Sequence, residues 1–443
     1  MKRYPAYQKT ELPWLKEVPV TWQLIRNKQF LTERKEFVGK DASKYPLLSL
    51  TKQGVILRDV SSGKGKFPKE FDSYKVVEPS NAIFCLFDMD ETPRTIGISK
   101  YRGMITGAYD VFELSNINSR FFYYYYASLD DKKDLKPLYT GLRKTIGVET
   151  FLHAKMPVPS KEEQQQIVLY LDTKTAQIDC AIRGYERLVA LLEERKTAVI
   201  NEAVTKGVRR GIVTKESGVN WLDKIPQHWE MRYAKQLFAL RRDKAREDDE
   251  QLTSSQKYGI ISQQEFMERE GRRVTVVLKG EDILKHVEAG DFVISMRSFQ
   301  GGLEYSHVSG KISSAYVMLI PNHDLVYDRY FRWLFKSESY IRALQGTSDL
   351  IRDGQALRYA SLAKVYLPCI PLNEQKEIAD YIDMEVRRID NAMIPIAKQM
   401  ELLRERRTRL ISDVVTGQVD VCDVVVPDRE AQDDGDEYDG AGA

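Results

Sequence analysis

The 443-residue sequence contains no apolar run near 18 residues, and residues 1–5 precede no apolar stretch. The first absence argues against a membrane-spanning helix and the second against a secretory signal. The four cysteines are too far apart in the sequence to suggest a zinc pair. We therefore expect reduced thiols, no membrane association and a cytoplasmic protein.

Recognisable catalytic patterns are also missing. Residues 61–66, Ser-Ser-Gly-Lys-Gly-Lys, lack the spacing and the Ser/Thr of a phosphate-binding loop, so we interpret them as a basic turn. The five histidines include no pair four residues apart and have no nearby cysteine, which argues against a metal site. Neither an Asn-Pro-Pro-aromatic run nor a Gly-rich turn suited to S-adenosylmethionine is present. We expect no catalytic residue, metal or cofactor in this chain.

The formal net charge of +2 hides an asymmetry. Residues 427–443 hold seven acidic residues against Arg429, a net of −6, so residues 1–426 carry +8. A moderately basic body fits an anionic partner. The acidic end is too polar to pack, and we expect residues 427–443 to be a disordered tail.

Tryptophan is rare, and its distribution reveals an internal repeat. Four of the five tryptophans lie in two nonapeptides, residues 14–22 and 221–229, which share the pattern Trp-Leu-x-x-Val/Ile-Pro-x-x-Trp. The two segments are 207 residues apart, and further matches follow at offsets of 207 to 211. These matches pair residues 103–109 with 310–316, Arg120 with Arg329, and residues 163–167 with 374–378. The chain is therefore a tandem duplication with small insertions in loops, such as the charged segment 241–251.

Each repeat begins with an α+β part and ends with a helical part. Short apolar runs broken by Gly, Pro and Ser predict strands near residues 45–50, 82–87 and 291–295, with helices near 119–129 and 328–344. We predict α+β domains at residues 1–160 and 208–372, and helical segments at residues 161–207 and 373–420.

Apolar residues spaced by seven define a seam along each helical segment. They are Leu171, Ile178, Tyr185, Leu192 and Val199 in the first copy, and Ile382, Ile389, Ile396, Leu403 and Leu410 in the second. A sustained heptad predicts a coiled coil, here about 60 Å long. Duplication within one chain favours pairing of the two helices with each other, and a zipper between two molecules is the alternative. Pro395 predicts a kink or break near residues 391–395.

Taken in order, the repeated motifs resemble the specificity subunit of type I restriction–modification systems over residues 7–425. Besides the nonapeptides, the resemblance rests on Glu-Gln at 163–164 and 374–375, Ile-Asp at 178–179 and 389–390, and the helix exits 203–207 and 414–417. The first exit departs from the family's Val-Thr-Gly by an inserted Lys206.

The resemblance implies a DNA-recognition subunit without chemistry of its own. Each α+β domain would be a target recognition domain that reads one half of a bipartite sequence in double-stranded DNA. The helices would pair as an antiparallel coiled coil that sets the gap and docks two modification methyltransferase subunits. Restriction/translocase subunits would join that core, and S-adenosylmethionine, ATP and Mg would belong to the partners.

Base recognition requires Arg, Asn, Gln or short hydroxyl side chains on loops, with Lys and Arg on phosphates. The candidates are Thr51, Lys52, Gln53, Arg94, Lys100, Arg102, Arg143 and Lys144 in the first domain, and Ser262, Gln263, Gln264, Arg297, Ser298, Gln300, Arg352 and Arg358 in the second. The alternative for each is an ordinary solvated loop residue. The aromatic run 121–126 fits a helix core better than a base-stacking platform. The run 404–409 could contact phosphate or the methyltransferase, or form a solvated helix face.

Two other functions stay open. The same architecture could serve a restriction class with a fused methyltransferase–nuclease partner. It could also be a two-headed protein-binding scaffold. Salt dependence separates the scaffold from a DNA reader, because DNA binding weakens log-linearly with salt concentration.

Overall fold

The computed structural model describes residues 2–58, 71–271, 283–295, 298–346 and 359–426, so the expected acidic tail lies outside the described residues. The chain divides into two compact units, residues 1–185 with 398–443, and residues 186–397. Both boundaries fall inside long helices. Each unit therefore contains one α+β domain and a part of both helices.

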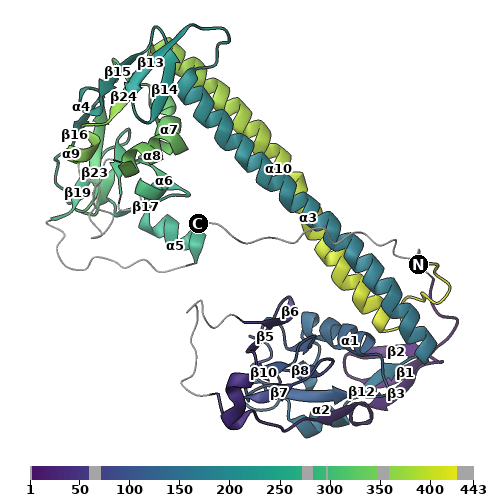
Figure 1. The fold of residues 1–443 in the computed structure, drawn as a ribbon. Helices are drawn as coiled ribbons and strands as arrows, with labels where there is room; N and C mark the ends of the chain where they lie inside the picture. The colour runs from purple at the N-terminus through teal and green to yellow at the C-terminus, as the bar shows by residue number, and fades with distance from the viewer. Residues whose placement is uncertain (1, 59–70, 272–282, 296–297, 347–358, 427–443) are drawn as a thin grey trace. The chain divides into compact units, whose positions relative to one another are not determined.

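The first unit contains antiparallel strands around a four-stranded sheet (Figure 1). That sheet has the order β4-β11-β8-β9, with bounds Leu31–Glu33, Asp110–Leu114, Ala82–Phe84 and Ile96–Ile98. Three strand pairs accompany it: β3–β12 (Gln23–Arg26, Lys155–Val158), β7–β10 (Lys75–Val77, Gly103–Ile105) and β5–β6 (Leu48–Thr51, Gly54–Leu57). The first nonapeptide lies in and just after the hairpin β1–β2 (Tyr7–Leu12, Leu15–Pro19).

The second unit repeats this topology strand for strand. Its four-stranded sheet has the order β16-β23-β20-β21, with bounds Phe238–Leu240, Val317–Pro321, Phe292–Ile294 and Glu304–Tyr305. The strand pairs are β15–β24 (Glu230–Tyr233, Tyr366–Cys369), β19–β22 (Lys285–Val287, Gly310–Ile312), β17–β18 (Leu252–Ser255, Gly259–Ser262) and β13–β14 (Thr214–Val219, Leu222–Pro226). The duplication seen in the sequence is thus a duplication of the α+β fold.

Helices complete the two domains. The first has α1 (Ser119–Lys132) and α2 (Val148–His153), and the second has α4 (Ala234–Leu237), α5 (Gln263–Glu270), α6 (Ser298–Gly301), α7 (Asp328–Lys336), α8 (Glu338–Gly346) and α9 (Tyr359–Leu362). The single helix expected over residues 328–344 is two helices. Ser337 separates them, because its hydroxyl donates to the Leu334 carbonyl at 2.6 Å while its backbone is extended.

Aromatic side chains fill both cores. Phe121, Phe122, Tyr125 and Tyr126 of the aromatic run are at most 1% exposed, so this run forms a helix core, as its pattern indicated. Phe84 of β8 lies in the same cluster and packs against Phe112 with ring centroids 6.0 Å apart. Such burial is the main favourable contribution to folding.

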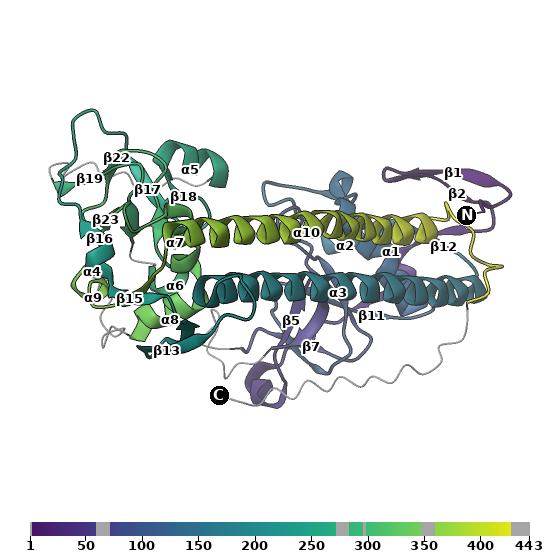
Figure 2. The same ribbon diagram turned by 90° about the horizontal axis from the view of Figure 1, so that it is seen from above.

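The two long helices, α3 (Lys161–Lys206) and α10 (Leu372–Val415), lie side by side in both views (Figures 1 and 2). In the first unit the start of α3 shares a core with the end of α10, and in the second unit the end of α3 shares a core with the start of α10. The helices are therefore antiparallel and pair within one chain. All ten seam residues are buried or half-buried.

Two equivalent ion pairs mark the register of the helices. Asp179 pairs with Arg407 at 2.9 Å in the first unit. Asp390 pairs with Lys196 at 2.7 Å in the second. The two aspartates are 211 residues apart, as are the two basic residues, so one repeated contact occurs twice. The Asp of each Ile-Asp motif thus binds the helix of the other repeat.

The break expected at Pro395 does not occur, because α10 continues from Leu372 to Val415 with Pro395 inside it. A proline inside a helix loses one backbone hydrogen bond and costs about 3 kcal/mol. Pro395 is exposed, whereas Ile396 and Ile389 of the seam are covered. Packing along the seam offsets the local cost, so the helix continues.

The C-terminal end of each long helix is part of the core beside it. Val204 at the end of α3 is fully buried in the second core, and its carbonyl accepts from the Tyr330 hydroxyl at 2.9 Å. Val414 and Val415 are fully buried in the first core. Gly207 and Gly417 follow the helices with φ of +78° and +72°, so both exits turn alike despite the inserted Lys206. Within the described part of the chain, no helix has the length and apolar character to cross a membrane.

Replacing Ile411 by Ala tests this shared core. Ile411 is 5% exposed and belongs to the first core, so Ile411→Ala should lower the free energy of unfolding by about 2–4 kcal/mol. Leu402→Ala is the matched control, because Leu402 is 46% exposed on the same helix and should cost less than about 1 kcal/mol. Urea unfolding followed by tryptophan fluorescence measures both. Equal losses would contradict the packing described here.

Candidate nucleic-acid interface

The first residue of each Glu-Gln motif holds a tryptophan of its nonapeptide. The Glu163 carboxylate accepts from Trp22 Nε1 at 2.9 Å and from the Tyr4 hydroxyl at 2.6 Å. The Glu374 carboxylate accepts from Trp229 Nε1 at 3.0 Å. Both tryptophans are at most 1% exposed, so each indole ring is shielded from water. A buried indole N–H requires an acceptor, which explains the pairing of the two motifs.

The second residue of each motif fixes the start of a domain helix. Gln164 accepts from the backbone N–H of Asn118 at 2.9 Å, and Asn118 is the N-cap of α1. Gln375 accepts from the backbone N–H of Tyr327 at 2.7 Å, and Tyr327 is the N-cap of α7. Each glutamine thereby ties a long helix to a domain.

A third repeated contact joins the domain helix to the long helix. In the first unit Asp172 of α3 pairs with Arg120 at 2.7 Å and accepts from the Tyr124 hydroxyl at 2.7 Å. In the second unit Asp383 of α10 accepts from Arg329 Nε at 3.1 Å and from Trp333 Nε1 at 2.7 Å.

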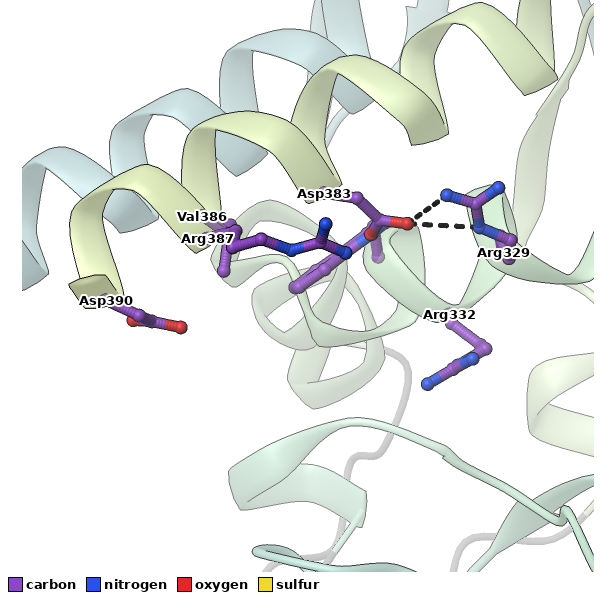
Figure 3. A pocket seen from close by; sticks show the side chains of 7 residues that line it. Arg329, Arg332, Asp383, Val386, Arg387 and Asp390 are labelled. Atoms are coloured by element: carbon purple, nitrogen blue, oxygen red, sulfur yellow. Dashed lines mark hydrogen bonds and ion pairs between the residues drawn. The ribbon is translucent and has the colours of Figure 1, made fainter.

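Figure 3 shows the Arg329–Asp383 contact at the edge of a pocket of about 350 Å³. Arg332 and Arg387 also line this pocket, together with Val386 and Asp390. The residues that carry the family resemblance therefore anchor domains to helices. The candidate interface residues lie elsewhere in each domain.

In the first domain several of the candidate DNA-contacting residues lie on segments that contact the β8–β9 hairpin. Thr51, Lys52 and Gln53 form the β5–β6 turn, where the Thr51 hydroxyl donates to the Gly54 carbonyl at 3.0 Å. Lys52 and Gln53 are exposed. The β5–β6 pair packs on Gly97 of β9, where an added Cβ would lie 2.7 Å from the side chains on either side.

The remaining candidates of the first domain attach to the same hairpin. Arg143 and Lys144 are exposed and pair with Asp88 and Asp90 of the β8–β9 loop, both at 2.8 Å. Lys100 follows β9 and is exposed.

Arg102 and Arg94 are bound within the domain to different extents. Arg102 pairs with Glu78 at 3.1 Å but stays 66% exposed. Arg94 differs, because its half-buried guanidinium pairs with Asp130 at 3.3 Å and with Asp131 at 2.9 Å. These contacts support a structural role for Arg94.

The second-domain candidates are more often part of the fold than the sequence suggested. Ser262 is the N-cap of α5, and its hydroxyl accepts from the Glu265 backbone N–H at 3.1 Å. Gln263 and Gln264 begin that helix, and Gln264 is exposed. Ser298 is fully buried, and its hydroxyl accepts from the Ser295 backbone N–H at 2.9 Å. Gln300 is exposed, whereas Arg297, Arg352 and Arg358 lie outside the described residues.

A second pocket, of about 240 Å³, contains residues that the sequence did not single out. The β17–β18 turn contributes Lys257 and Tyr258, strand β21 contributes Tyr305, and α7 contributes Arg332 and Lys336. Glu304 also lines the pocket and pairs with Lys336, so the lining combines both charges with aromatic side chains. The residues come from segments far apart in the sequence, so no local pattern could have revealed them.

A buried histidine holds the charged segment 241–251, which joins β16 to β17. The sequence interpretation of this segment as an insertion was wrong, because the equivalent segment of the first domain, residues 34–47 between β4 and β5, is longer. His286 is 1% exposed and contacts Asp249 through Nδ1 at 2.8 Å and Glu288 through Nε2 at 2.9 Å. Burial alone lowers the pKa of His286, but its hydrogen bonds to Glu288 and Asp249 raise that pKa above the usual value. Hydrogen bonds from His286 and Ser309 lower the pKa of Glu288 to about 2. Arg241 anchors the start of this segment to Asp291 at 2.6 Å.

The chain is similar to known proteins in sequence and in fold. Residues 21–182 match the family model described as the type I restriction modification DNA specificity domain. No curated protein matches the chain in sequence. A solved structure from work on complex assembly and conformational transition of the type I R-M system aligns with 91% of this chain and 99% of that chain, at TM-score 0.64 and 13% identity.

Two further structures are similar at lower scores. The HsdS subunit from Thermoanaerobacter tengcongensis is 14% identical, with 91% of this chain and 98% of that chain covered, at TM-score 0.48. The type I S subunit from M. genitalium is 10% identical, with 89% and 96% covered, at TM-score 0.34. The family match confirms the predicted resemblance to type I specificity domains over residues 21–182, and the structure at TM-score 0.64 shows that the fold is shared.

The histidine cluster predicts a pH dependence. The folded pKa of His286 is raised, so its stabilising contribution is complete below about pH 6.5 and is lost as the pH rises through the folded value. The folded pKa of Glu288 is lowered, so its contribution is complete above about pH 4.5 and is lost as the pH falls towards 2. His286→Gln should lower the free energy of unfolding by about 3 kcal/mol near pH 6. Above about pH 6.5 the variant should lose less stability with rising pH than the wild type does.

Thermal unfolding between pH 6 and 9 measures this effect. His323→Gln is the control, because the His323 side chain is 67% exposed. Identical pH profiles for wild type and His286→Gln would show that His286 carries no charge in the folded protein.

Proposed function

We propose that this chain is the sequence-specific DNA-recognition subunit of a type I restriction–modification complex and has no catalytic function of its own. Each α+β domain reads one half of a bipartite target in double-stranded DNA. The antiparallel helices set the gap between the two half-sites. The observation that carries the proposal is the DNA specificity domain matched at residues 21–182, together with a second domain of the same strand order.

Two repeated domains with different surface residues suit a split, asymmetric target. The β5–β6 turn of the first domain presents Lys52 and Gln53, whereas the β17–β18 turn of the second presents Lys257 and Tyr258. Turns on a rigid sheet vary without disturbing the fold, and base contacts need such positions. Joining two readers in one chain raises affinity, because the second contact becomes intramolecular.

The partners follow from the same proposal. Two modification methyltransferase subunits dock on the helical regions, and restriction/translocase subunits join the complex. These partners supply S-adenosylmethionine, ATP and Mg, so this chain binds none of them. Exposed apolar residues on the long helices, including Leu188, Leu191 and Ile394, are available for such docking.

Methylation mapping of host DNA with and without an intact copy of this gene tests the proposal. We expect one split motif to lose its methylation when the gene is disrupted and to regain it on complementation. Replacing residues 208–372 by the corresponding domain of a relative should change one half of the motif and leave the other half unchanged. An unchanged methylome in a host that expresses the methyltransferase would contradict the proposed function.

Removing two cations of the first domain tests the DNA contact. Arg143→Gln with Lys144→Gln should weaken binding to the target duplex. If both side chains neutralise phosphates, the negative slope of log K against log salt concentration should become less steep by about 1.8. Lys9→Gln with Lys16→Gln removes equal charge from exposed positions of the β1–β2 hairpin and should leave the slope nearly unchanged. Fluorescence anisotropy over a salt series measures both variants. Equal slopes would exclude these two residues as phosphate contacts.

A further inference from the structure

Leu142 is an apolar side chain that the fold leaves completely in water. It is 103% exposed, at the tip of the turn 141–144. The turn is closed by reciprocal backbone hydrogen bonds between Thr140 and Thr145, at 2.8 and 3.1 Å. The Thr140 hydroxyl adds a bond to the Thr145 carbonyl at 3.0 Å. The position of Leu142 is therefore defined by a closed loop.

The loop is also attached firmly to the domain. Ile146 directly follows it, is 1% exposed, and donates its backbone N–H to the Leu86 carbonyl at 2.8 Å. The Asp88 backbone N–H donates to the Arg143 carbonyl at 2.9 Å. Gly141 has φ of +67°, a conformation that glycine adopts without strain. A rigid loop presents its tip without an ordering cost on binding.

Two cationic residues, Arg143 and Lys144, directly follow Leu142 in the sequence. Arg143 is 72% exposed and Lys144 is 49% exposed, and Asp88 and Asp90 hold them in place by ion pairs at 2.8 Å. Surface ion pairs of this kind contribute at most about 1 kcal/mol, so both cations can exchange to a phosphate. The sequence repeats an apolar residue before Arg in Ile351-Arg352, at the offset of 209 that relates Arg120 to Arg329. Residues 351 and 352 lie outside the described residues.

We infer that Leu142 is an apolar wedge that enters the base stack of the first half-site from the minor groove, while Arg143 and Lys144 contact the flanking phosphates. Leu is one of the side chains that proteins insert between base steps, and such insertion unstacks and kinks the duplex. A single apolar tip beside two cations is too small for an ordinary protein interface, which buries about 800 Å² on each partner. The inference deepens the proposed function and rests on it.

The test uses the full chain with its copurified methyltransferase and duplexes that carry the target found by methylation mapping. Leu142→Ala should weaken specific binding about 10-fold, and Leu142→Met should bind like wild type, because a long apolar side chain is kept. Both variants should fold normally, since Leu142 is completely exposed. Val213→Ala is the matched control, because Val213 is 68% exposed and lies outside both the long helices and the turns of the first domain.

A 2-aminopurine placed in turn at each step of the first half-site reports unstacking directly. Wild type and Leu142→Met should raise its fluorescence at one step, and Leu142→Ala should abolish that rise. Wild-type binding with no affinity change in Leu142→Ala and no fluorescence rise would overturn the wedge and leave the proposed function standing. Normal DNA binding by Leu142→Ala with loss of the methyltransferase would identify a protein contact and also overturn it. Failure of the wild-type complex to bind the duplex would refute the proposed function together with the wedge.

Discussion

Each long helix ends inside a hydrophobic core that belongs mainly to the other half of the chain. Val204 of the first repeat is buried with the second domain, and Val414 and Val415 of the second repeat are buried with the first domain. Neither half therefore completes its own core. The carboxylates of Glu163 and Glu374 each accept a hydrogen bond from a buried tryptophan. Burial of apolar surface supplies most of the energy, and the carboxylates add direction to the packing.

This constraint explains which residues repeat and which do not. The residues that repeat most clearly bind helix to domain, as Asp172 and Asp383 do with an arginine and an aromatic side chain. The turns carry different residues in the two copies, for example Lys52 and Gln53 against Lys257 and Tyr258. A scaffold held by buried contacts allows its turns to diverge at little cost in stability. The two copies of the frame therefore present different turn surfaces.

The sequence predicted much of the fold and little of the interface. Heptad spacing located the seam, and repeated motifs located both domains. Of the kink or break expected near residues 391–395, the break is wrong, because packing along the seam lets α10 continue through Pro395. The single helix over residues 328–344 is also wrong, because the Ser337 hydroxyl caps the end of α7. Ser298 was assigned to an interface, but the structure buries its hydroxyl against the Ser295 backbone. Polar residue type alone does not distinguish a side chain that caps a turn from one that faces a ligand.

The heptad seam and the tandem repeat could be predicted from the sequence alone, because each is a regular pattern along the chain. The antiparallel direction is visible in the pairs Asp179–Arg407 and Lys196–Asp390, which no local pattern links. The ion pairs of Arg94 and the pocket beside α7 likewise depend on residues that are distant in sequence, as does the exposure of Leu142. The spacing of apolar residues indicates which face of a helix is apolar, because residues three and four positions apart lie on the same face. Which charge meets which carboxylate, and which side chain stays in water, is decided when distant segments pack together.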